Sequence, residues 1–309
     1  MNILFTGASS FTGFWFVKTL AAAGHEMVCP VTKGLENYTD IRRQRVEQLK
    51  PLCRFIPHAP FGSERFLNTV RGHQFDLLCH HGAEVADYRS AEFDALRALQ
   101  NNTFNLRAVL TAAKARGLKA VVLTGTVFEP DEGRGDKPLR AFSPYGLSKA
   151  MTFQCFRYYC HEAGVPLGKF VIPNPFGPFE ERRFTAYLME NWKAGRPAAV
   201  KAPDYRRDSI HVDLLATVYS RFADRLAELK TGCAKTNPSG YTGKQGGFAQ
   251  RVAREVRARL DWACELQLAE QADFSEPLNR TNTEPAAKLV PEWNERKAWD
   301  VFADFYAPK

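Results

Sequence analysis

The first thirteen residues constrain the fold more than any other stretch of the chain. Residues 3–5 form a short apolar run of the kind found in a buried strand, and a turn bounded by Gly7 and Gly13 follows it. An apolar face at helical spacing comes next, and Gly24 stands where that helix would end. A strand, a glycine turn and a helix N-terminus form a cradle for a phosphate group, because glycine lets the backbone come close and the helix offers unpaired N–H groups.

The small residues of this turn depart from the common dinucleotide-binding pattern G-x-G-x-x-G. Gly7 and Gly13 fit the two ends of the related pattern G-x-x-G-x-x-G, and Ser10 stands in place of its middle glycine. The turn alone also fits a purely structural role, since many α/β proteins join a strand to a helix through small residues. Its position at the head of repeated strand–helix units favours nucleotide binding.

Composition limits the classes of protein to which the chain can belong. With 309 residues, of which 45% are hydrophobic and 25% charged, it can fold as one large globular domain or two smaller ones. No apolar run reaches the length of a membrane span, and the chain enters a strand at once, so we expect neither a signal peptide nor a membrane partner. Seven cysteines without a C-x-x-C pair indicate reduced thiols and a cytoplasmic location.

The net charge of +8 favours anionic partners in general. A nucleic-acid binder would rest on this charge alone, because no basic stripe interleaved with aromatic residues is present. We therefore expect a phosphorylated small substrate and no nucleic-acid partner.

Strand-like and helix-like segments alternate through residues 1–172. The strands are expected at residues 3–5, 26–31, 54–57, 75–79, 119–123 and 167–172. Regular alternation of this kind predicts an α/β fold with a Rossmann-type, doubly wound parallel sheet. Past Pro173 the pattern becomes irregular, so residues 173–309 are expected to form a smaller C-terminal region, with residues 208–225 returning to the first domain.

The end of the second expected strand bears on the choice of cofactor. In dinucleotide-binding folds an acidic residue about 20 positions past the glycines binds the ribose 2′-hydroxyl of NAD. Thr32 and Lys33 occupy that place here, and Arg42, Arg43 and Arg45 follow on the next expected helix. These residues favour the 2′-phosphate of NADP over NAD, unless they are simply solvated charges on a surface helix.

Two pairs of neighbouring residues in the next segments are conspicuous. His80 and His81 end the fourth expected strand, where neighbours point to opposite faces, so we expect no metal site. The small residues Gly82 and Ala83 after them would let a cofactor lie close. Asn101-Asn102 interrupts a helix expected over residues 91–116 and either distorts its backbone or forms a polar face.

Tyr145 and Lys149 are the candidate residues for acid–base chemistry. They stand four apart on a helix expected to open at Ser143-Pro144, so their side chains share one face. A nearby ammonium stabilises a phenolate, and Lys149, helped by the positive charge of the cofactor, is expected to lower the pKa of Tyr145 from its ordinary value near 10. Thr124, at the end of the neighbouring strand, could hold a substrate oxygen opposite the tyrosine. By itself, a tyrosine and lysine at this spacing also fit a surface pair.

The order of the glycine turn, Gly82-Ala83, Asn102, Thr124 and Tyr145/Lys149 resembles the short-chain dehydrogenase/reductase superfamily. Over about residues 1–215 the chain resembles its extended branch, the NAD(P)-dependent epimerase/dehydratase family that acts on nucleotide sugars. That resemblance implies a Rossmann fold, NAD or NADP as cofactor, a nucleotide-sugar or related small-molecule substrate and a homodimer.

The resemblance also implies roles for the matched residues. Cofactor contacts are expected from Gly7, Ser9, Ser10, Phe11, Gly13, Thr32, Lys33, Gly82, Ala83, Asn102, Tyr145 and Lys149. The expected catalytic residues are Thr124, which binds the substrate oxygen, Tyr145 as acid–base, and Lys149, which tunes it. Substrate contacts are expected from Thr124, Thr126, Asn174 and, for a diphosphate, Arg206 or Arg207.

Departures from the family pattern narrow the expected reaction. The acidic residue after the third strand is absent, and His58 and Ala59 stand near its place. The Asp-Glu pair of the 4,6-dehydratases is replaced by Gly125 and Thr126, so dehydration is not expected. Reduction of a 4-keto sugar is therefore the leading hypothesis. A 4-epimerase with tightly bound NAD and a non-catalytic NAD(P) sensor are the alternatives.

Overall fold

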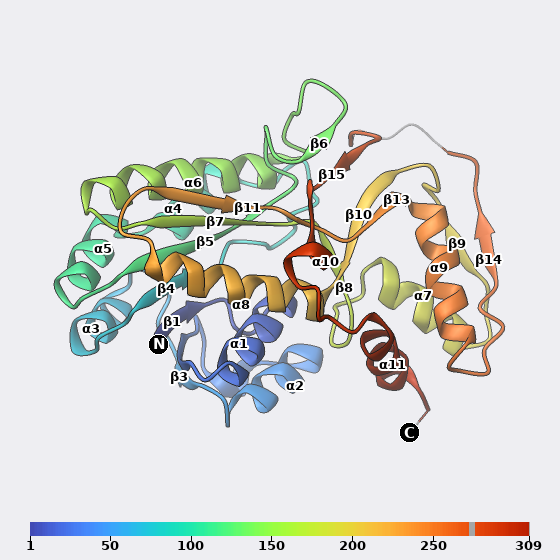
Figure 1. Cartoon of the computed structure of the whole chain (residues 1–309), viewed down its shortest axis with the longest axis horizontal. Coiled ribbons are helices and arrows are strands. Elements are labelled where there is room, and N and C mark those ends of the chain that lie inside the picture. The colour runs from blue at the N-terminus through green and yellow to red at the C-terminus, as the bar shows by residue number, and fades with distance from the viewer. Residues whose placement is uncertain (272–275, 309) are drawn as a thin grey trace.

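A seven-stranded sheet, parallel throughout, forms the centre of the molecule (Figure 1). The computed structural model describes residues 1–271 and 276–308. The strand order is β11-β7-β5-β4-β1-β2-β3. The strands are β1 (Asn2–Thr6), β2 (Glu26–Pro30), β3 (Arg54–Ile56), β4 (Leu77–His80), β5 (Ala120–Thr126), β7 (Leu167–Ile172) and β11 (Cys233–Thr236).

The strand order changes direction between β1 and β4, which are neighbours in the sheet. Thr6, the last residue of β1, pairs with His80, the last residue of β4. The turns that leave these two strands therefore diverge from one point at the carboxyl edge of the sheet. In open parallel sheets such a switch point is where a crevice for ligands forms.

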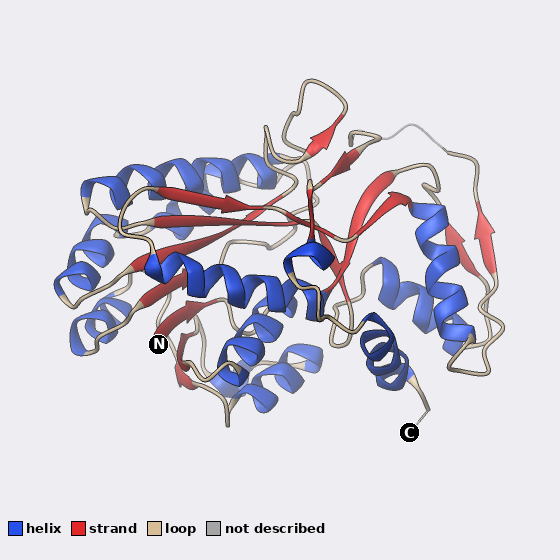
Figure 2. Cartoon of the chain, viewed as in Figure 1, coloured by secondary structure: helices blue, strands red, loops and turns tan. Residues whose placement is uncertain are grey.

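Helices cover both faces of the sheet (Figure 2). On one face lie α1 (Phe11–Ala22), α2 (Asp40–Leu49) and α8 (Val212–Glu228). On the other lie α3 (Glu64–Gly72), α4 (Ala95–Thr103), α5 (Leu106–Ala115) and α6 (Pro144–Glu162). The apolar positions at helical spacing in α1, such as Phe14 and Val17, are fully buried, and each contributes roughly 1.5–3 kcal/mol by leaving water.

Most of the remaining elements form a second part of the molecule, beside the carboxyl edge of the sheet (Figure 1). Its three-stranded sheet contains β8 (Asn174–Phe176), β10 (Arg206–His211) and β13 (Tyr241–Lys244). Short strand pairs join β9 (Ala198–Val200) to β14 (Leu266–Leu268), β6 (Arg134–Gly135) to β15 (Arg280–Thr281), and β12 (Pro238–Ser239) to β16 (Glu284–Pro285). The helical segments are η1 (Leu35–Asn37) near β2, and α7 (Phe184–Lys193), α9 (Gln245–Arg257), α10 (Ala286–Leu289) and α11 (Glu295–Tyr306).

The expected doubly wound parallel fold is confirmed, with two local corrections. The single helix expected over residues 91–116 is two helices, and the break lies at Phe104 and Asn105 rather than at Asn101-Asn102. Asn105 adopts φ 52° and donates through Nδ2 to Gly62 O, and asparagine tolerates this left-handed conformation better than most residues. The seventh strand, β11, was not expected, because it is short and only partly buried.

The described residues bear on two expectations, the absence of a membrane span and the reduced state of the cysteines. None of their helices has the length and apolar content that a membrane span would require. All seven cysteines are free, and four of them are buried.

Candidate active site

The turn after β1 is tightly packed against its surroundings. Gly7 has φ 81°, and a Cβ atom there would lie 2.7 Å from the backbone nitrogen of Gly82. A Cβ atom at Gly13 would lie 2.2 Å from Gly7 O. Ser10 caps α1, because its Oγ accepts from Gly13 N at 3.1 Å. Only glycine fits at Gly7, and the close approach of the two loops leaves the N-terminus of α1 facing the crevice.

A cavity of about 1180 Å³ opens at this switch point and continues to the C-terminal part of the chain. Fourteen of the residues predicted from the sequence line it. They are Gly7, Ser9, Ser10, Phe11, Thr32, Gly82, Ala83, Asn102, Thr124, Thr126, Tyr145, Lys149, Asn174 and Arg207. Gly13, Lys33 and Arg206 are not among the lining residues.

Tyr145 and Lys149 lie in the first two turns of α6, which begins at Pro144. Lys149 is 4% exposed. The Tyr145 ring meets Tyr88 and Phe93 edge-on, at centroid distances of 5.4 and 5.9 Å. These two aromatic residues belong to the loop between β4 and α4 and were not predicted as site residues, since nothing in their spacing singles them out.

The lowering of the pKa of Tyr145, expected from Lys149 together with a bound cofactor, is not found for the protein alone. Burial raises the pKa of Tyr145 above its ordinary value, and the nearby Glu129 carboxylate raises it further, while Arg183 acts in the opposite direction. Burial also lowers the pKa of Lys149 to about 8, although Glu129 opposes that change. Loss of hydration is the largest cause of both shifts, because it disfavours the charged form of each group.

A buried ion cluster lies directly behind the end of β5. Lys169 Nζ is 2.6 Å from Glu129 Oε2 and 2.7 Å from Glu132 Oε1. Glu129 Oε1 also accepts from Thr126 N at 2.7 Å, which fixes the strand end that carries Thr124. A Cβ atom at Gly125 would lie 2.8 Å from both Glu129 Oε1 and Lys169 Cε, so the cluster occupies the space a side chain would need there.

The paired histidines at the end of β4 make separate sets of contacts on opposite sides of the strand. His80 Nδ1 is 3.1 Å from Thr6 Oγ1, and its Nε2 is 3.1 Å from Asn102 O. His81 contacts three hydroxyl groups, those of Ser10, Thr12 and Thr124. Among the described residues no group of three or more His, Cys, Asp or Glu side chains could hold a metal ion.

Asn102 is buried beneath the loop that follows β4. Its Oδ1 accepts from Glu84 N at 2.9 Å, and its Nδ2 donates to Thr152 Oγ1 at 3.3 Å. It therefore joins α4 to α6 and shapes the wall of the cavity near Gly82 and Ala83.

The basic residues after β2 differ in their access to the cavity. Arg42, together with Thr32 and Tyr38, lines it. Lys33 is exposed and its Nζ lies 4.7 Å from the centre of the Tyr38 ring. Arg45 is fully buried and donates to Ser9 O, Phe179 O and Glu181, so it braces the turn and is not available to a ligand. Of the basic residues considered for a 2′-phosphate, Arg42 alone lines the cavity.

The C-terminal part of the chain supplies the far wall. The Arg207 guanidinium lies 4.1 Å from the centre of the Tyr205 ring and donates to Glu276 Oε2 at 3.1 Å. Asn174 Nδ2 donates to Asp208 O at 3.1 Å. Glu180 and Arg183 also line this wall and were missed from the sequence, because no motif marks them.

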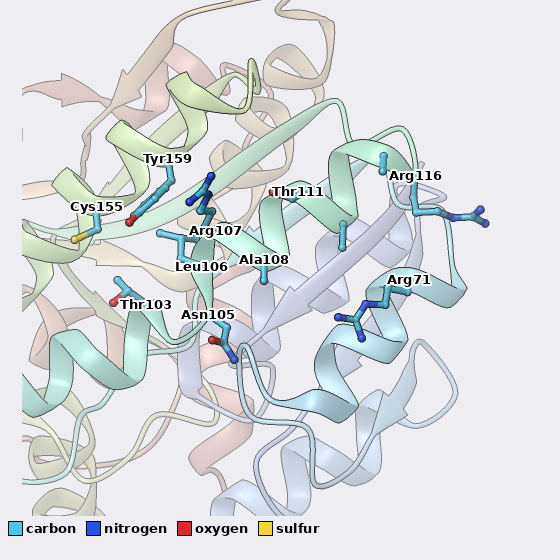
Figure 3. Close-up of a pocket in the computed structure, with 12 residues that line it drawn as sticks. Arg71, Thr103, Asn105, Leu106, Arg107, Ala108, Thr111, Arg116, Cys155 and Tyr159 are labelled. Atoms are coloured by element: carbon cyan, nitrogen blue, oxygen red, sulfur yellow. The ribbon is translucent and has the colours of Figure 1, made fainter.

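A second groove of about 1120 Å³ lies on the outer side of α5, between Arg71 of α3 and Tyr159 of α6 (Figure 3). Arg107 and Arg116 line it as well. None of the predicted catalytic or cofactor residues takes part in it. The cavity at the switch point is therefore the candidate active site.

A doubly wound parallel sheet with a phosphate cradle at its switch point defines a dinucleotide-binding protein of the Rossmann class. The profile of the NAD dependent epimerase/dehydratase family matches residues 3–233, and the chain belongs to this family. The family resemblance expected from the sequence is thereby confirmed.

Individual relatives agree with the family assignment. Over 162 residues the chain is 29% identical to the UDP-glucose 4-epimerase of Azospirillum brasilense, a match covering 50% of this chain and 44% of that protein. The match thus spans less than half the length of this relative.

Among solved structures, a UDP-glucuronic acid 4-epimerase variant from Bacillus cereus, in complex with UDP-4-deoxy-4-fluoro-glucuronic acid and NAD, is similar with a TM-score of 0.77, 15% identity and 99% coverage of both chains. A dTDP-glucose 4,6-dehydratase from Streptomyces venezuelae with bound NAD has a TM-score of 0.73 and 18% identity, and the match covers 99% of this chain and 97% of that one. At these identities the likeness establishes the fold.

Proposed function

We propose that the chain is an NAD-dependent 4-epimerase of a nucleotide-linked sugar. The observation that carries this proposal is that Thr124, Tyr145 and Lys149 line the same cavity as the phosphate cradle after β1. Family membership and the epimerases among the relatives support it.

The residues at the switch point fit a dinucleotide. The cradle formed by Gly7 and Gly82 is a place that a Cβ atom would fill, and the N-terminus of α1 offers N–H groups to a diphosphate. NAD bound there would supply the hydride acceptor for oxidation of the sugar carbon. Tyr145 Oη takes up or returns the hydroxyl proton, Thr124 Oγ1 orients the sugar oxygen, and the Lys149 ammonium favours the phenolate form of Tyr145.

The C-terminal part of the chain is proposed to hold the nucleotide-sugar. We assign residues 173–309 mainly to substrate binding, and residues 1–172 with about 208–225 to the dinucleotide domain. Arg207 and Asn174 line the far wall and can donate hydrogen bonds to a diphosphate. The relatives' UDP-sugars make a uridine diphosphate the first nucleotide to test.

Reduction of a 4-keto sugar with NADPH is the second candidate. The absence of a carboxylate after β2 and the position of Arg42 on the cavity wall favour it. Two observations weigh against NADP: Lys33 does not line the cavity, and Arg45 is bound to backbone carbonyls and Glu181. Loss of water, the dehydratase reaction, is disfavoured because Glu129 and Lys169 leave no space for a carboxylate at position 125.

We also propose a cytoplasmic homodimer. The seven free cysteines suit a reducing compartment. The helices α4 and α6 pack against each other, and four exposed apolar side chains lie on or beside them; they are Leu96, Phe104, Leu147 and Tyr158. A second copy of the chain would cover them.

Replacing Tyr145 tests the proposed function. With UDP-glucose or UDP-glucuronic acid as substrate, Tyr145→Phe should lower kcat by about 100- to 10,000-fold, the range for loss of a general acid–base, while NAD binding changes less than about threefold. Tyr158→Phe, on the exposed side of the same helix, is the control and should match the parent. Equal turnover by Tyr145→Phe and the parent would exclude the catalytic role. A parent that binds NAD but converts no sugar nucleotide would favour the sensor.

A further inference from the structure

His81 lies between the phosphate cradle and Thr124. Its Nε2 is 3.0 Å from both Ser10 Oγ and Thr12 Oγ1, in the first turn of α1 and its cap. Its Nδ1 is 3.0 Å from Thr124 Oγ1, at the other side of the ring. The ring is flanked by Phe5 and Phe16, with centroids 5.7 and 5.2 Å away. One imidazole therefore contacts a cofactor-binding element and a proposed catalytic residue at once.

The hydrogen bonds of Ser10 decide which nitrogen of His81 carries the proton. Ser10 Oγ donates its hydrogen to Gly7 O at 2.9 Å and accepts from Gly13 N at 3.1 Å. Ser10 therefore has only a lone pair left for His81, so Nε2 must be the donor. A neutral imidazole has one N–H group, and Nδ1 is consequently the acceptor of the Thr124 hydroxyl hydrogen.

Neutral His81 is consistent with its surroundings. Burial, followed by the neighbouring Lys149 ammonium, lowers the pKa of His81 to about 3. The side chain is therefore uncharged at neutral pH, and its donor and acceptor roles stay linked. If Nε2 carries the proton, Nδ1 cannot.

We propose that His81 is a positioning residue that holds the Thr124 hydroxyl in a fixed orientation, by accepting its hydrogen at Nδ1 while Nε2–H anchors the ring to Ser10 and Thr12. This role rests on the proposed function, in which Thr124 orients the substrate oxygen. Thr124 donates toward His81, so its oxygen lone pairs are left to accept from the ligand and from the neighbouring Tyr219 hydroxyl. An apolar side chain of similar size would fill the same space but would take away the acceptor that His81 offers to the Thr124 hydroxyl.

The protonation pattern can be measured without any substrate. In the parent chain labelled with ¹⁵N-histidine, the nitrogen resonances that disappear in His81→Gln identify His81. We expect a protonated Nε2 and a bare Nδ1 at neutral pH. A protonated Nδ1 would overturn the proposal, whether or not the proposed enzymatic function holds.

Two amide substitutions test the two nitrogens of the His81 ring separately. In His81→Asn the side-chain oxygen can stand near the position of Nδ1 and accept from Thr124, whereas in His81→Gln the amide nitrogen reaches the position of Nε2 and can donate to Ser10. His81→Asn should keep kcat within about threefold of the parent and weaken NADH binding about 5- to 10-fold, the effect of one lost hydrogen bond. His81→Gln should do the opposite, lowering kcat and keeping the NADH dissociation constant.

Coupling to Thr124 distinguishes positioning from a structural role. If His81 acts through Thr124, His81→Gln should not slow Thr124→Val any further, because the hydroxyl that it orients is already gone. Additive losses of kcat in the double variant, or equal losses of kcat and NADH affinity in His81→Asn and His81→Gln, would overturn the proposal. So would unchanged values in both variants. NADH binding, followed by its fluorescence, tests the Ser10 side even if the parent turns over no sugar nucleotide.

Discussion

Glu180 lines the cavity wall and is buried, so the charged form of its carboxyl group is unfavourable. Its Oε2 accepts from Thr185 Oγ1 at 2.8 Å. Burial raises the pKa of Glu180 to about 8, although this hydrogen bond and Arg183 lower it. The folded chain thus keeps a proton on Glu180 at pH values where the unfolded chain, with an ordinary carboxyl pKa near 4.3, has lost it. The folded state is therefore destabilised as pH rises from about 4.3 to 8, with a slope of up to about 1.4 kcal/mol per pH unit.

Glu180→Gln should remove this loss of stability. Urea unfolding at several pH values should give equal or slightly lower stability than the parent near pH 4 and higher stability near pH 8. Glu162→Gln, which changes an exposed carboxyl on α6, is the control. If the difference in unfolding free energy between the parent and Glu180→Gln stays constant from pH 4 to 8, the raised pKa of Glu180 is contradicted.

Single residues of the site were predictable to different degrees. Tyr145, Lys149 and Gly7 belong to local patterns, and the structure gathers them in one cavity. His81 and Glu129 owe their importance to contacts with residues distant in sequence, Thr124 and Lys169. The residues that flank them in the sequence give no sign of these contacts. The raised pKa of Tyr145 was not predicted for a similar reason. The spacing to Lys149 can be read from the sequence, whereas burial depends on the whole fold.

At the scale of elements, the β1–turn–α1 unit offers a matched pair of glycines. Gly7 and Gly24 both have positive φ, 81° and 86°. An alanine at either position is strained by about 1 kcal/mol or more. Gly24 has no atom within 4 Å of an added Cβ, whereas at Gly7 that atom would lie 2.7 Å from Gly82 N.

Gly7→Ala should therefore be the more harmful substitution. We expect Gly24→Ala to lower the unfolding free energy by about 1 kcal/mol and leave NAD affinity unchanged. Gly7→Ala should lower stability further and weaken NAD binding at least about tenfold, because the two loops of the cradle must separate. Calorimetric titration with NAD and urea unfolding provide the comparison. Equal NAD affinity in the two variants would show that the Gly7–Gly82 approach does not shape the cofactor site.

Elements with a strong local pattern were predicted closely. The strand expected at residues 167–172 is β7, and Gly24 follows the end of α1 as expected. The break between α4 and α5 depends on Asn105, whose side chain reaches Gly62 on a distant loop. β11 becomes a strand because it pairs with β7, and its own sequence has only a weak strand pattern.

At the scale of the whole molecule, the surface of α4 and α6 is the predicted dimer interface. Leu96 is 71% exposed and Tyr158 is 61% exposed. Large apolar patches on monomers are uncommon and often mark interfaces. The double variant Leu96→Asp/Tyr158→Asp should therefore sediment as a folded monomer while the parent sediments as a dimer.

The control for this prediction lies on β14. Leu268 has 47% of its surface exposed and is remote in sequence from α4 and α6. Leu268→Asp should remain dimeric. A parent that is monomeric at tens of micromolar, or a double variant that still dimerises, would place the interface elsewhere or remove it.

The overall architecture could be predicted from the alternation of elements and the first turn, and the family match supports it. The shape of the cavity could not, because its walls combine residues from Thr6 to Glu276. Arg45 shows the difference: its sequence position suggests a cofactor contact, but the fold directs its guanidinium to Ser9 O and Phe179 O. Choice between cofactors therefore depends on long-range packing.

The identity of the nucleotide carried by the purified protein tests the central claim most directly. The protein would be denatured immediately after purification, and the released small molecules would be identified by mass spectrometry. A recycling epimerase predicts bound NAD in a substantial fraction of molecules. An empty protein that binds NADPH better than NADH would contradict the epimerase and support the ketoreductase. An empty protein that binds neither dinucleotide would contradict the whole assignment of the cavity.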